Sequence, residues 1–341
     1  MTIAGMGLMP NSLLSGKINS KSEEKIDYEP IPARWRIYED GGFDLISGEI
    51  NLKNCYPAID GHPVHPVSIR VTTTDNGGEI SYQLPEGKFL LKLGRGNDSL
   101  VLGAFLEEFA VAPHWIHPLA GAKIVGADRW FKQGLGFSGP SGIMQLRQPL
   151  KRMESTNIDT HIEDAWTYDS YLLTAFLNGD NQTLSCAAYD HSNYLQRTTL
   201  YNRQYRYGLI DRHLDSNTIF CEAGFALEKI TLNHNSLNLP ELHFIAGKKP
   251  FDTMRYMAKN IAQTSSVRLD KKPRYHFCSW YEKMEKYSQQ DLENLLAGLK
   301  SIEPEIPLQT IQIDNSYCVL GDWLDSNENW QRSEERRVGK E

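Results

Sequence analysis

The chain has 341 residues, a net charge of −7 and 40% hydrophobic residues. Its length allows more than one buried core, so we expect more than one domain. The acidic balance disfavours nucleic acid and anionic membranes as partners, and no apolar stretch approaches the length of a membrane span. Residues 1–15 lack the basic start and the clean apolar run of a signal peptide, which favours a cytoplasmic location.

The cysteines and histidines give no sign of a metal or cofactor site. The five cysteines are scattered and include no CxxC pair, which predicts buried or partly buried thiols in a reducing compartment. His62 and His65 are three apart, as are His114 and His117, but neighbouring prolines and the lack of a third ligand argue against metal binding. We therefore expect no metal and no cofactor.

The first 250 residues are predicted to form a polar arm and then a β-rich domain. Residues 1–30 are polar and suit a loose arm or an edge segment, with no functional site. Within residues 31–250, short alternating segments such as 67–71 and 80–84 are separated by turn signals, of which Asp75-Asn76-Gly77-Gly78 is a strong one. Frequent turns and few helical stretches predict a β-sandwich.

Residues 251–272 are predicted to form a helix followed by an exposed link. Pro250 suits the start of this helix. Its apolar face is formed by Met254, Met257, Ala258 and Ile261. We expect the two methionines to pack in a core.

Residues 273–331 contain the pattern of a strand, a helix and a second strand. Ser288 suits the cap of the helix, with Asp291 as its capping-box partner. One face of the helix carries Leu292, Leu295, Leu296 and Leu299. Ile311 and Ile313 belong to the second strand. Polar and aromatic residues gather just past the ends of both strands, which is where (β/α) barrels place their chemistry.

The residues past these strands resemble a known family. The matching residues are Ser279-Trp280, Asp314-Asn315-Ser316-Tyr317, Gly321-Asp322-Trp323 and Asn327. They are similar to the ends of the first two barrel strands in the α-galactosidases (melibiases) of glycoside hydrolase family 36. The resemblance implies a mainly β chain, in which a large N-terminal β-sandwich precedes the first βα units of a truncated (β/α)8 barrel. Two residues depart from the family pattern: Asn315 replaces its second Asp, and Ser316 replaces its Gly.

The resemblance implies a retaining glycosidase that removes terminal α-galactosyl groups from oligosaccharides or glycoconjugates. Glycoside hydrolysis needs two carboxylates across the scissile bond, and the family places both on later barrel strands, beyond residue 341. We therefore expect no catalytic residue in this chain and no activity from it alone. The expected partners are α-galactoside sugars, and the full-length protein is expected to form a homo-oligomer.

The candidates for substrate binding are Asp314, Asn315, Trp280, Trp323, Asp322 and Tyr317. Asp314 would accept hydrogen bonds from sugar hydroxyls, or it would cap the next helix or turn. Asn315 can donate and accept hydrogen bonds without a charge. Trp280 and Trp323 suit the walls of a pocket, or packing at the barrel rim. Asp322 would orient a loop or touch the sugar.

The segment 130–142, WFKQGLGFSGPSG, is similar to a further stretch of the family. Its aromatic side chains stand among glycines and offer flat apolar faces, on which the C–H surface of a sugar can stack. One interpretation places the segment at the mouth of the sugar pocket. The other places Trp130, Phe131 and Phe137 in the sandwich core or at a domain interface.

Other functions stay open at this point. The chain could be a non-catalytic carbohydrate-binding or assembly sandwich, or part of a galactosyltransferase of the raffinose-synthase kind, which the Asn315 departure permits. A barrel glycosidase acting on α-glucosides is a further alternative, against which the Gly-Asp-Trp at 321–323 argues.

Residues 332–341 hold seven charged residues and one apolar residue, and we expect them to be a non-native tail.

Overall fold

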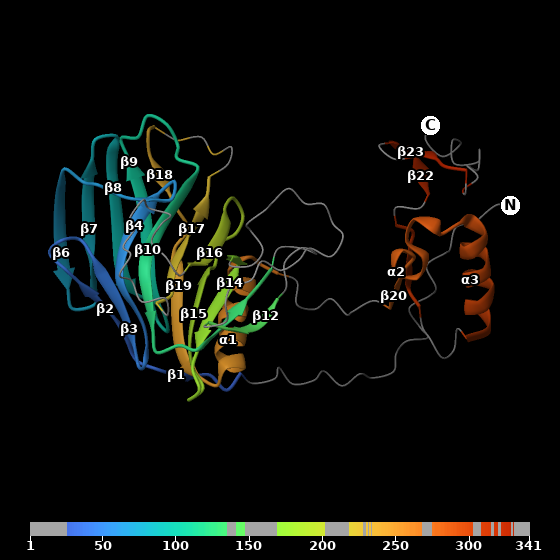
Figure 1. The fold of residues 1–341 in the computed structure, drawn as a ribbon, viewed down its shortest axis with the longest axis horizontal. Coiled ribbons are helices and arrows are strands. Elements are labelled where there is room, and N and C mark those ends of the chain that lie inside the picture. The colour runs from blue at the N-terminus through green and yellow to red at the C-terminus, as the bar shows by residue number, and fades with distance from the viewer. Residues whose placement is uncertain are drawn as a thin grey trace. The chain divides into compact units, whose positions relative to one another are not determined.

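The computed structural model describes residues 26–134, 141–146, 169–201, 218–227, 230, 232, 234–267, 275–302, 308–314, 317–319, 322–328 and 330. These residues belong to two compact units, a larger one that ends at Val267 and a smaller one that begins after it. Figure 1 shows the strands of the larger unit and the helices and short strands of the smaller one. Among the described residues, no helix is long and apolar enough to cross a membrane.

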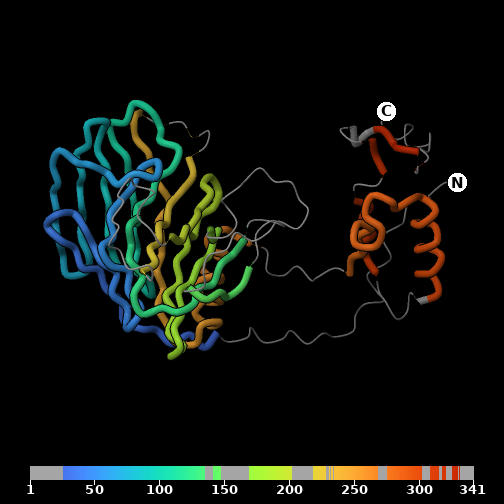
Figure 2. Tube along the Cα trace, in the orientation of Figure 1, coloured from blue at the N-terminus to red at the C-terminus, as the bar shows by residue number. Residues whose placement is uncertain are grey.

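The larger unit is built on two antiparallel sheets, and Figure 2 follows the backbone as it runs back and forth through them. The first sheet has the order β12 (Gly142–Gln145), β11 (Arg129–Lys132), β14 (Leu173–Leu177), β15 (Gln182–Ala188), β19 (Leu242–Lys248), β9 (Leu100–Glu107), β8 (Gly87–Arg95), β7 (Gly77–Leu84) and β6 (Ser68–Thr74). Two short strands extend it, since β1 (Glu29–Pro30) pairs with β19 and β18 (Leu237–Asn238) pairs with β9.

The second sheet has the order β13 (Asp169–Tyr171), β16 (Leu195–Tyr201), β17 (Phe220–Ala226), β10 (Trp115–Val125), β4 (Ile50–Ile59), β3 (Phe43–Ser47) and β2 (Ala33–Ile37), with β5 (His62–Pro63) paired to β4. Apolar side chains from both sheets form one continuous core. The mainly β fold class and the sandwich are therefore confirmed.

The hairpin of β6 and β7 shows how local sequence sets this fold. Ile80, Tyr82 and Leu84 alternate along β7 and are all buried, as the pattern predicts. The turn before them needs glycine at position 77, where φ is +150° and an added Cβ would lie 1.9 Å from the Leu93 carbonyl oxygen. The predicted turn at 75–78 is thereby confirmed.

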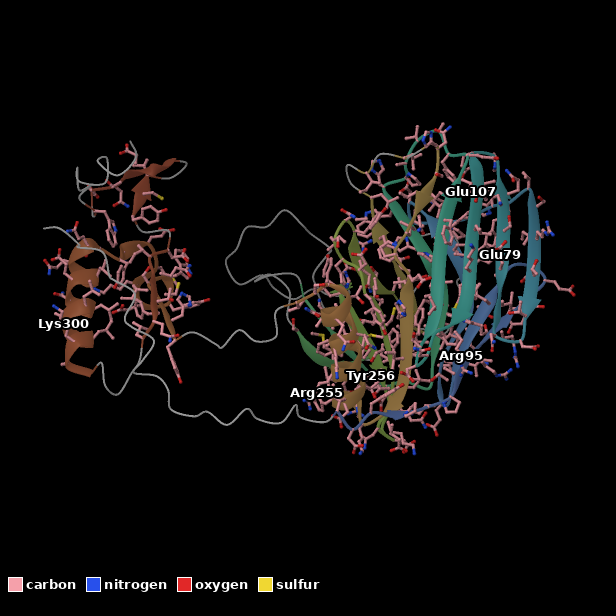
Figure 3. All side chains as sticks on the ribbon, turned by 180° about the vertical axis from the view of Figure 1, so that it is seen from behind. Glu79, Arg95, Glu107, Arg255, Tyr256 and Lys300 are labelled. Atoms are coloured by element: carbon pink, nitrogen blue, oxygen red, sulfur yellow. The ribbon has the colours of Figure 1, made fainter. Side chains whose placement is uncertain are left out.

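Helix α1 (Pro250–Thr264) packs on the first sheet, and the predicted helix is confirmed. Met254 and Met257 are buried in a second apolar cluster, which includes Leu173, Ala175, Leu177, Ala187 and Ile245. Ala258, which the sequence placed on the same face, is exposed. Tyr256 of α1 (labelled in Figure 3) stacks on Tyr28 with ring centroids 4.4 Å apart.

The smaller unit begins with β20 (His276–Cys278), α2 (Trp280–Lys283), a 3-10 turn at Met284–Lys286, α3 (Gln289–Ile302) and β21 (Thr310–Gln312). A hairpin of β22 (Cys318–Val319) and β23 (Asp322–Ser326) follows. Strands β20 and β21 run parallel, with Cys278 opposite Gln312. The predicted strand-helix-strand unit is therefore confirmed, while its continuation into a complete barrel stays a prediction.

The start of α3 is fixed by the predicted capping box. The backbone N–H and the hydroxyl of Ser288 donate to Oδ2 of Asp291 at 2.9 and 2.8 Å, and the Asp291 N–H donates to the Ser288 hydroxyl at 3.3 Å. A hydrogen bond from Lys283 and those from Ser288 lower the pKa of Asp291 to about 2. Along the helix Leu292, Leu295 and Leu299 are half-buried, whereas Leu296 is 38% exposed.

Candidate functional site

Asp314 lies where β21 ends, beside the end of β20. Because the two strands are parallel, their carboxyl ends meet at one edge of the sheet. The backbone N–H of Asp314 donates to the hydroxyl of Ser279 at 3.0 Å. The Ser279 N–H in turn donates to the Gln312 carbonyl at 3.1 Å, and the Ser279 side chain is fully buried. The serine that follows β20 thus fixes the backbone of the acid that follows β21.

The carboxylate of Asp314 is held by side chains from both strands. Its Oδ2 accepts a hydrogen bond from the Gln312 side-chain amide at 3.2 Å and lies 3.7 Å from the Cys278 sulfur. The residue is half-buried. A carboxylate oriented in this way can accept hydrogen bonds from the hydroxyls of a ligand. Its alternative role, as a cap for the next helix or turn, stays a prediction, because residues 315 and 316 lie outside the described residues.

The other predicted binding residues are placed only in part. Trp280 follows Ser279 directly, opens α2 and is half-buried. Tyr317 is also half-buried, and its carbonyl accepts a hydrogen bond from the Asn327 N–H at 3.1 Å. Asn315 lies outside the described residues, as do the side chains of Asp322 and Trp323. The structure therefore brings Asp314 and Trp280 to one strand edge, and the binding roles of all six residues stay predictions.

Three aromatic residues that sequence reasoning did not assign to the site lie close together in the smaller unit. Tyr287 is fully buried, and its ring centroid lies 6.4 Å from that of Phe277 and 6.4 Å from that of Trp330. The Trp330 indole N–H also donates to the Tyr287 carbonyl at 3.1 Å. Burial raises the pKa of the Tyr287 phenol. Aromatic residues recur in the sequence here, but which of them stack depends on the fold.

The segment 130–142 is described only at its two ends. Trp130 is 1% exposed and belongs to the main sandwich core, and Phe131 packs against the second apolar cluster. Phe137 lies outside the described residues. For Trp130 the structure therefore supports the core interpretation over the pocket interpretation.

All five cysteines are described, and all are free thiols. Cys55, Cys186 and Cys221 are buried, and burial raises the pKa of each. Cys278 and Cys318 are half-buried, so the predicted buried and partly buried thiols are confirmed. In the described ranges no group of three or more His, Cys, Asp or Glu side chains could hold a metal ion.

Comparison with known proteins gives structural likenesses only. No family model matches the chain, and no curated protein matches it in sequence. Among solved structures, an α-galactosidase from Thermus thermophilus, TtGalA with stachyose, is 15% identical with a TM-score of 0.42, over 75% of this chain and 47% of that one. An α-N-acetylgalactosaminidase from Bifidobacterium bifidum, NagBb, is 8% identical with a TM-score of 0.49, over 82% and 50%.

A glycoside hydrolase family 97 enzyme from Pseudoalteromonas sp. strain K8, in complex with panose, is also similar, at 8% identity and a TM-score of 0.41 over 89% of this chain and 51% of that one. The chain thus spans about half the length of each of these structures. All three are glycoside hydrolases, and likenesses at these identities concern the fold alone.

Proposed function

We propose that this chain provides part of the sugar-binding site of a retaining α-galactosidase-like glycosidase, one that removes terminal α-galactosyl groups from oligosaccharides or glycoconjugates. The observation that carries the proposal is the placement of Asp314 at the carboxyl edge of two parallel strands, with its backbone held by Ser279 and its carboxylate by Gln312. The family resemblance of the residues around it supports a sugar as the ligand.

The physical basis is an ionised acceptor that is oriented before the ligand arrives. Hydrogen bonds to a charged group contribute about 1.5–3 kcal/mol, roughly twice as much as neutral ones. The contacts from Gln312 and Cys278 converge on Oδ2, so they fix the direction of the carboxylate. In the proposed site Asn315 stands where the family has a second Asp, and a neutral amide would bind hydroxyls less strongly. We therefore propose weak binding by this chain.

We assign no catalytic role to any residue of this chain. Retaining hydrolysis needs a carboxylate nucleophile and an acid/base carboxylate about 5–5.5 Å apart. By the resemblance, both would come from further barrel strands. Transfer of a galactosyl group to another sugar would use the same binding site as hydrolysis. A binding role for Asp314 therefore fits both reactions and does not distinguish between them.

The proposal is tested by the affinity of the chain for galactose, measured by ligand-observed NMR. Asp314→Asn keeps the shape but removes the charge, and we expect it to weaken binding at least tenfold, in line with the loss of about 1.5–3 kcal/mol. Asp325→Asn is the matched control, because Asp325 is exposed in the same unit, and it should bind as the unchanged chain does. Equal binding by all three proteins, or no binding of galactose, would overturn the proposal.

Hydrolysis is tested in parallel with p-nitrophenyl α-galactoside. We expect no turnover by this chain, since we assign it no catalytic carboxylate. Turnover that Asp314→Asn abolished would instead make Asp314 a catalytic acid.

The domain boundaries, the homo-oligomer, the cytoplasmic location and the absence of nucleic-acid and membrane partners stay predictions.

A further inference from the structure

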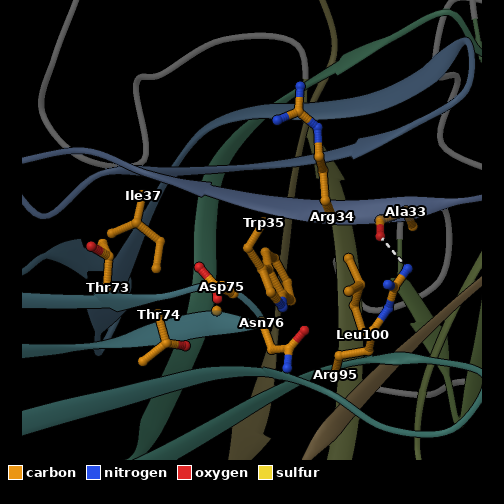
Figure 4. Close-up of a pocket in the computed structure, with 11 residues that line it drawn as sticks. Ala33, Arg34, Trp35, Ile37, Thr73, Thr74, Asp75, Asn76, Arg95 and Leu100 are labelled. Atoms are coloured by element: carbon orange, nitrogen blue, oxygen red, sulfur yellow. Dashed lines mark hydrogen bonds between the residues drawn. The ribbon is translucent and has the colours of Figure 1, made fainter.

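A groove with a volume of about 190 Å³ lies in the larger unit, between β2 of the second sheet and strands β6 to β9 of the first (Figure 4). The residues on which the argument rests are Trp35, Asp75, Asn76 and Arg95. None of them belongs to the sugar site proposed at Asp314, and the sequence suggested no site here.

Trp35 provides a rigid apolar wall of this groove. Its ring makes edge-to-face contacts with Phe43 and Phe244, at centroid distances of 5.8 and 5.6 Å. Its indole N–H donates to the Gly94 carbonyl at 2.9 Å. The side chain is only half-buried, so part of the ring still faces the groove. An aromatic face held by such contacts loses little conformational freedom when a ligand packs against it.

Two polar side chains, those of Asp75 and Asn76, line the groove from the β6–β7 hairpin. Thr74 pairs with Gly77, so Asp75 and Asn76 form the two-residue loop. Gly77, which follows the loop, has a φ of +150°, and its Cα lies so close to the Leu93 carbonyl that no side chain fits there. This close approach fixes the end of the loop beside Leu93. Both side chains are exposed and make no side-chain hydrogen bond with any other described residue. The loop therefore offers the groove a carboxylate and an amide that are available to a ligand.

Arg95 lines the groove from the end of β8, and Figure 3 labels it on the rim of the sheet. Its guanidinium donates to the Ala33 carbonyl at 2.9 Å, shown as the dashed line in Figure 4. This bond uses one of the five N–H donors of the group and holds its plane in place. The guanidinium of Arg34, by contrast, points away from the groove in Figure 4.

The chemistry of the lining selects a small, uncharged ligand with many hydroxyls. Sugar hydroxyls both donate and accept, which suits the acceptors of Asp75 and Asn76 and the donors of Asn76 and Arg95. An anion would meet the Asp75 carboxylate, and a wholly apolar ligand would leave the polar groups unpaired. Drug-sized ligands use pockets of about 300–1,000 Å³, so a groove of about 190 Å³ suits one ring. We propose that this groove binds a single pyranose unit of a saccharide, at a site separate from Asp314.

The test follows the Trp35 indole N–H resonance in ¹H–¹⁵N spectra of the whole chain, assigned by its loss in Trp35→Phe. Methyl α-galactoside and methyl α-glucoside are added separately. We expect at least one of them to shift this resonance in a saturable way. Asp75→Ala should weaken that response about tenfold or more, because it removes a charged acceptor. Asp180→Ala is the matched control, an exposed aspartate in the turn between β14 and β15, and it should leave the affinity unchanged.

Four results would overturn the inference. These are no shift of the Trp35 resonance with either sugar, a shift with inorganic phosphate alone, equal weakening by Asp75→Ala and Asp180→Ala, and loss of the Trp35 response in Asp314→Ala. The last result would show one sugar site in place of two. A Trp35 response that survives Asp314→Ala, in a chain whose Asp314 site fails its own test, would support the groove and reject the proposed glycosidase site.

Discussion

Replacing Trp130 by alanine is expected to lower the free energy of unfolding of the β-sandwich by about 3–5 kcal/mol. Trp130 is 1% exposed and is the largest fully buried side chain among the described residues. It lies on β11, near the edge of the first sheet, and packs in the main core. Removing its indole leaves a cavity that the rigid strands around it cannot fill. Chemical denaturation followed by circular dichroism measures the loss.

The matched control for this variant is Phe251→Ala. Phe251 is also aromatic, but it is 68% exposed at the start of α1, so its loss should change the free energy of unfolding by no more than about 0.5 kcal/mol. Equal effects of the two variants would contradict the core role of Trp130. If Trp130→Ala kept full stability and lost galactose binding, the segment 130–142 would belong to the sugar pocket after all.

The sandwich could be predicted from sequence because burial in a strand follows a local rule. Ile80, Tyr82 and Leu84 alternate in the sequence and face the core in the structure. The order of the strands could not be predicted in this way. Strand β9 pairs with β19, joining Leu102 to Leu242, and no local pattern encodes a pairing between segments so distant in the chain.

In the candidate site, too, the local features could be predicted from sequence and the long-range contacts could not. Asp314 stands out because it follows a strand, and the structure places it at the expected edge. Cys278 and Gln312 hold its carboxylate only because the register of β20 and β21 sets them opposite each other. That register joins segments more than 30 residues apart, and no local pattern encodes it. The groove at Trp35 was missed for a similar reason, since its lining comes from two sheets.

The two helix faces were predicted well at their centres and less well at their margins. Met254 and Met257 of α1 are buried, but Ala258 is exposed. In α3 the exposed residue is Leu296. Ala258 follows the buried Met257, and Leu296 follows the half-buried Leu295, so each is turned by about 100° from that neighbour on the helix. The width of the buried stripe depends on the surface that covers it, which the sequence of the helix does not contain.

Lys132 presents the opposite case, because it is a charged residue whose burial no sequence pattern predicts. It lies at the end of β11, its side chain is fully buried, and its ammonium has no hydrogen-bond partner among the described residues. Burial lowers its pKa from 10.5 to about 8, against the opposing effect of the Asp169 charge. A buried ammonium without a partner destabilises the folded protein whenever it carries its proton.

Lys132→Met is therefore expected to stabilise the protein at neutral pH, by an amount that disappears in alkali. A fall in pKa from 10.5 to about 8 corresponds to a cost of about 3 kcal/mol for keeping the lysine charged in the folded state. Below pH 8 the free energy of unfolding of the original chain is lowered by this full amount. As the pH rises from 8 to 10.5, the unfolded chain binds more protons than the folded one, so the original chain gains stability relative to the variant.

The measurement is the difference in free energy of unfolding between Lys132→Met and the original chain, taken at several pH values from neutral to 10.5. Other groups that titrate in alkali, such as the buried tyrosines, affect both proteins equally and cancel in this difference. Lys123→Met is the matched control, because Lys123 is exposed on β10, and this variant should change the free energy of unfolding by no more than about 0.5 kcal/mol. A difference for Lys132→Met that stayed constant over this range would show that the lysine is not held charged in the core. A difference that shrinks by about 3 kcal/mol would show that the charged form of Lys132, a residue within the segment 130–142, destabilises the folded sandwich.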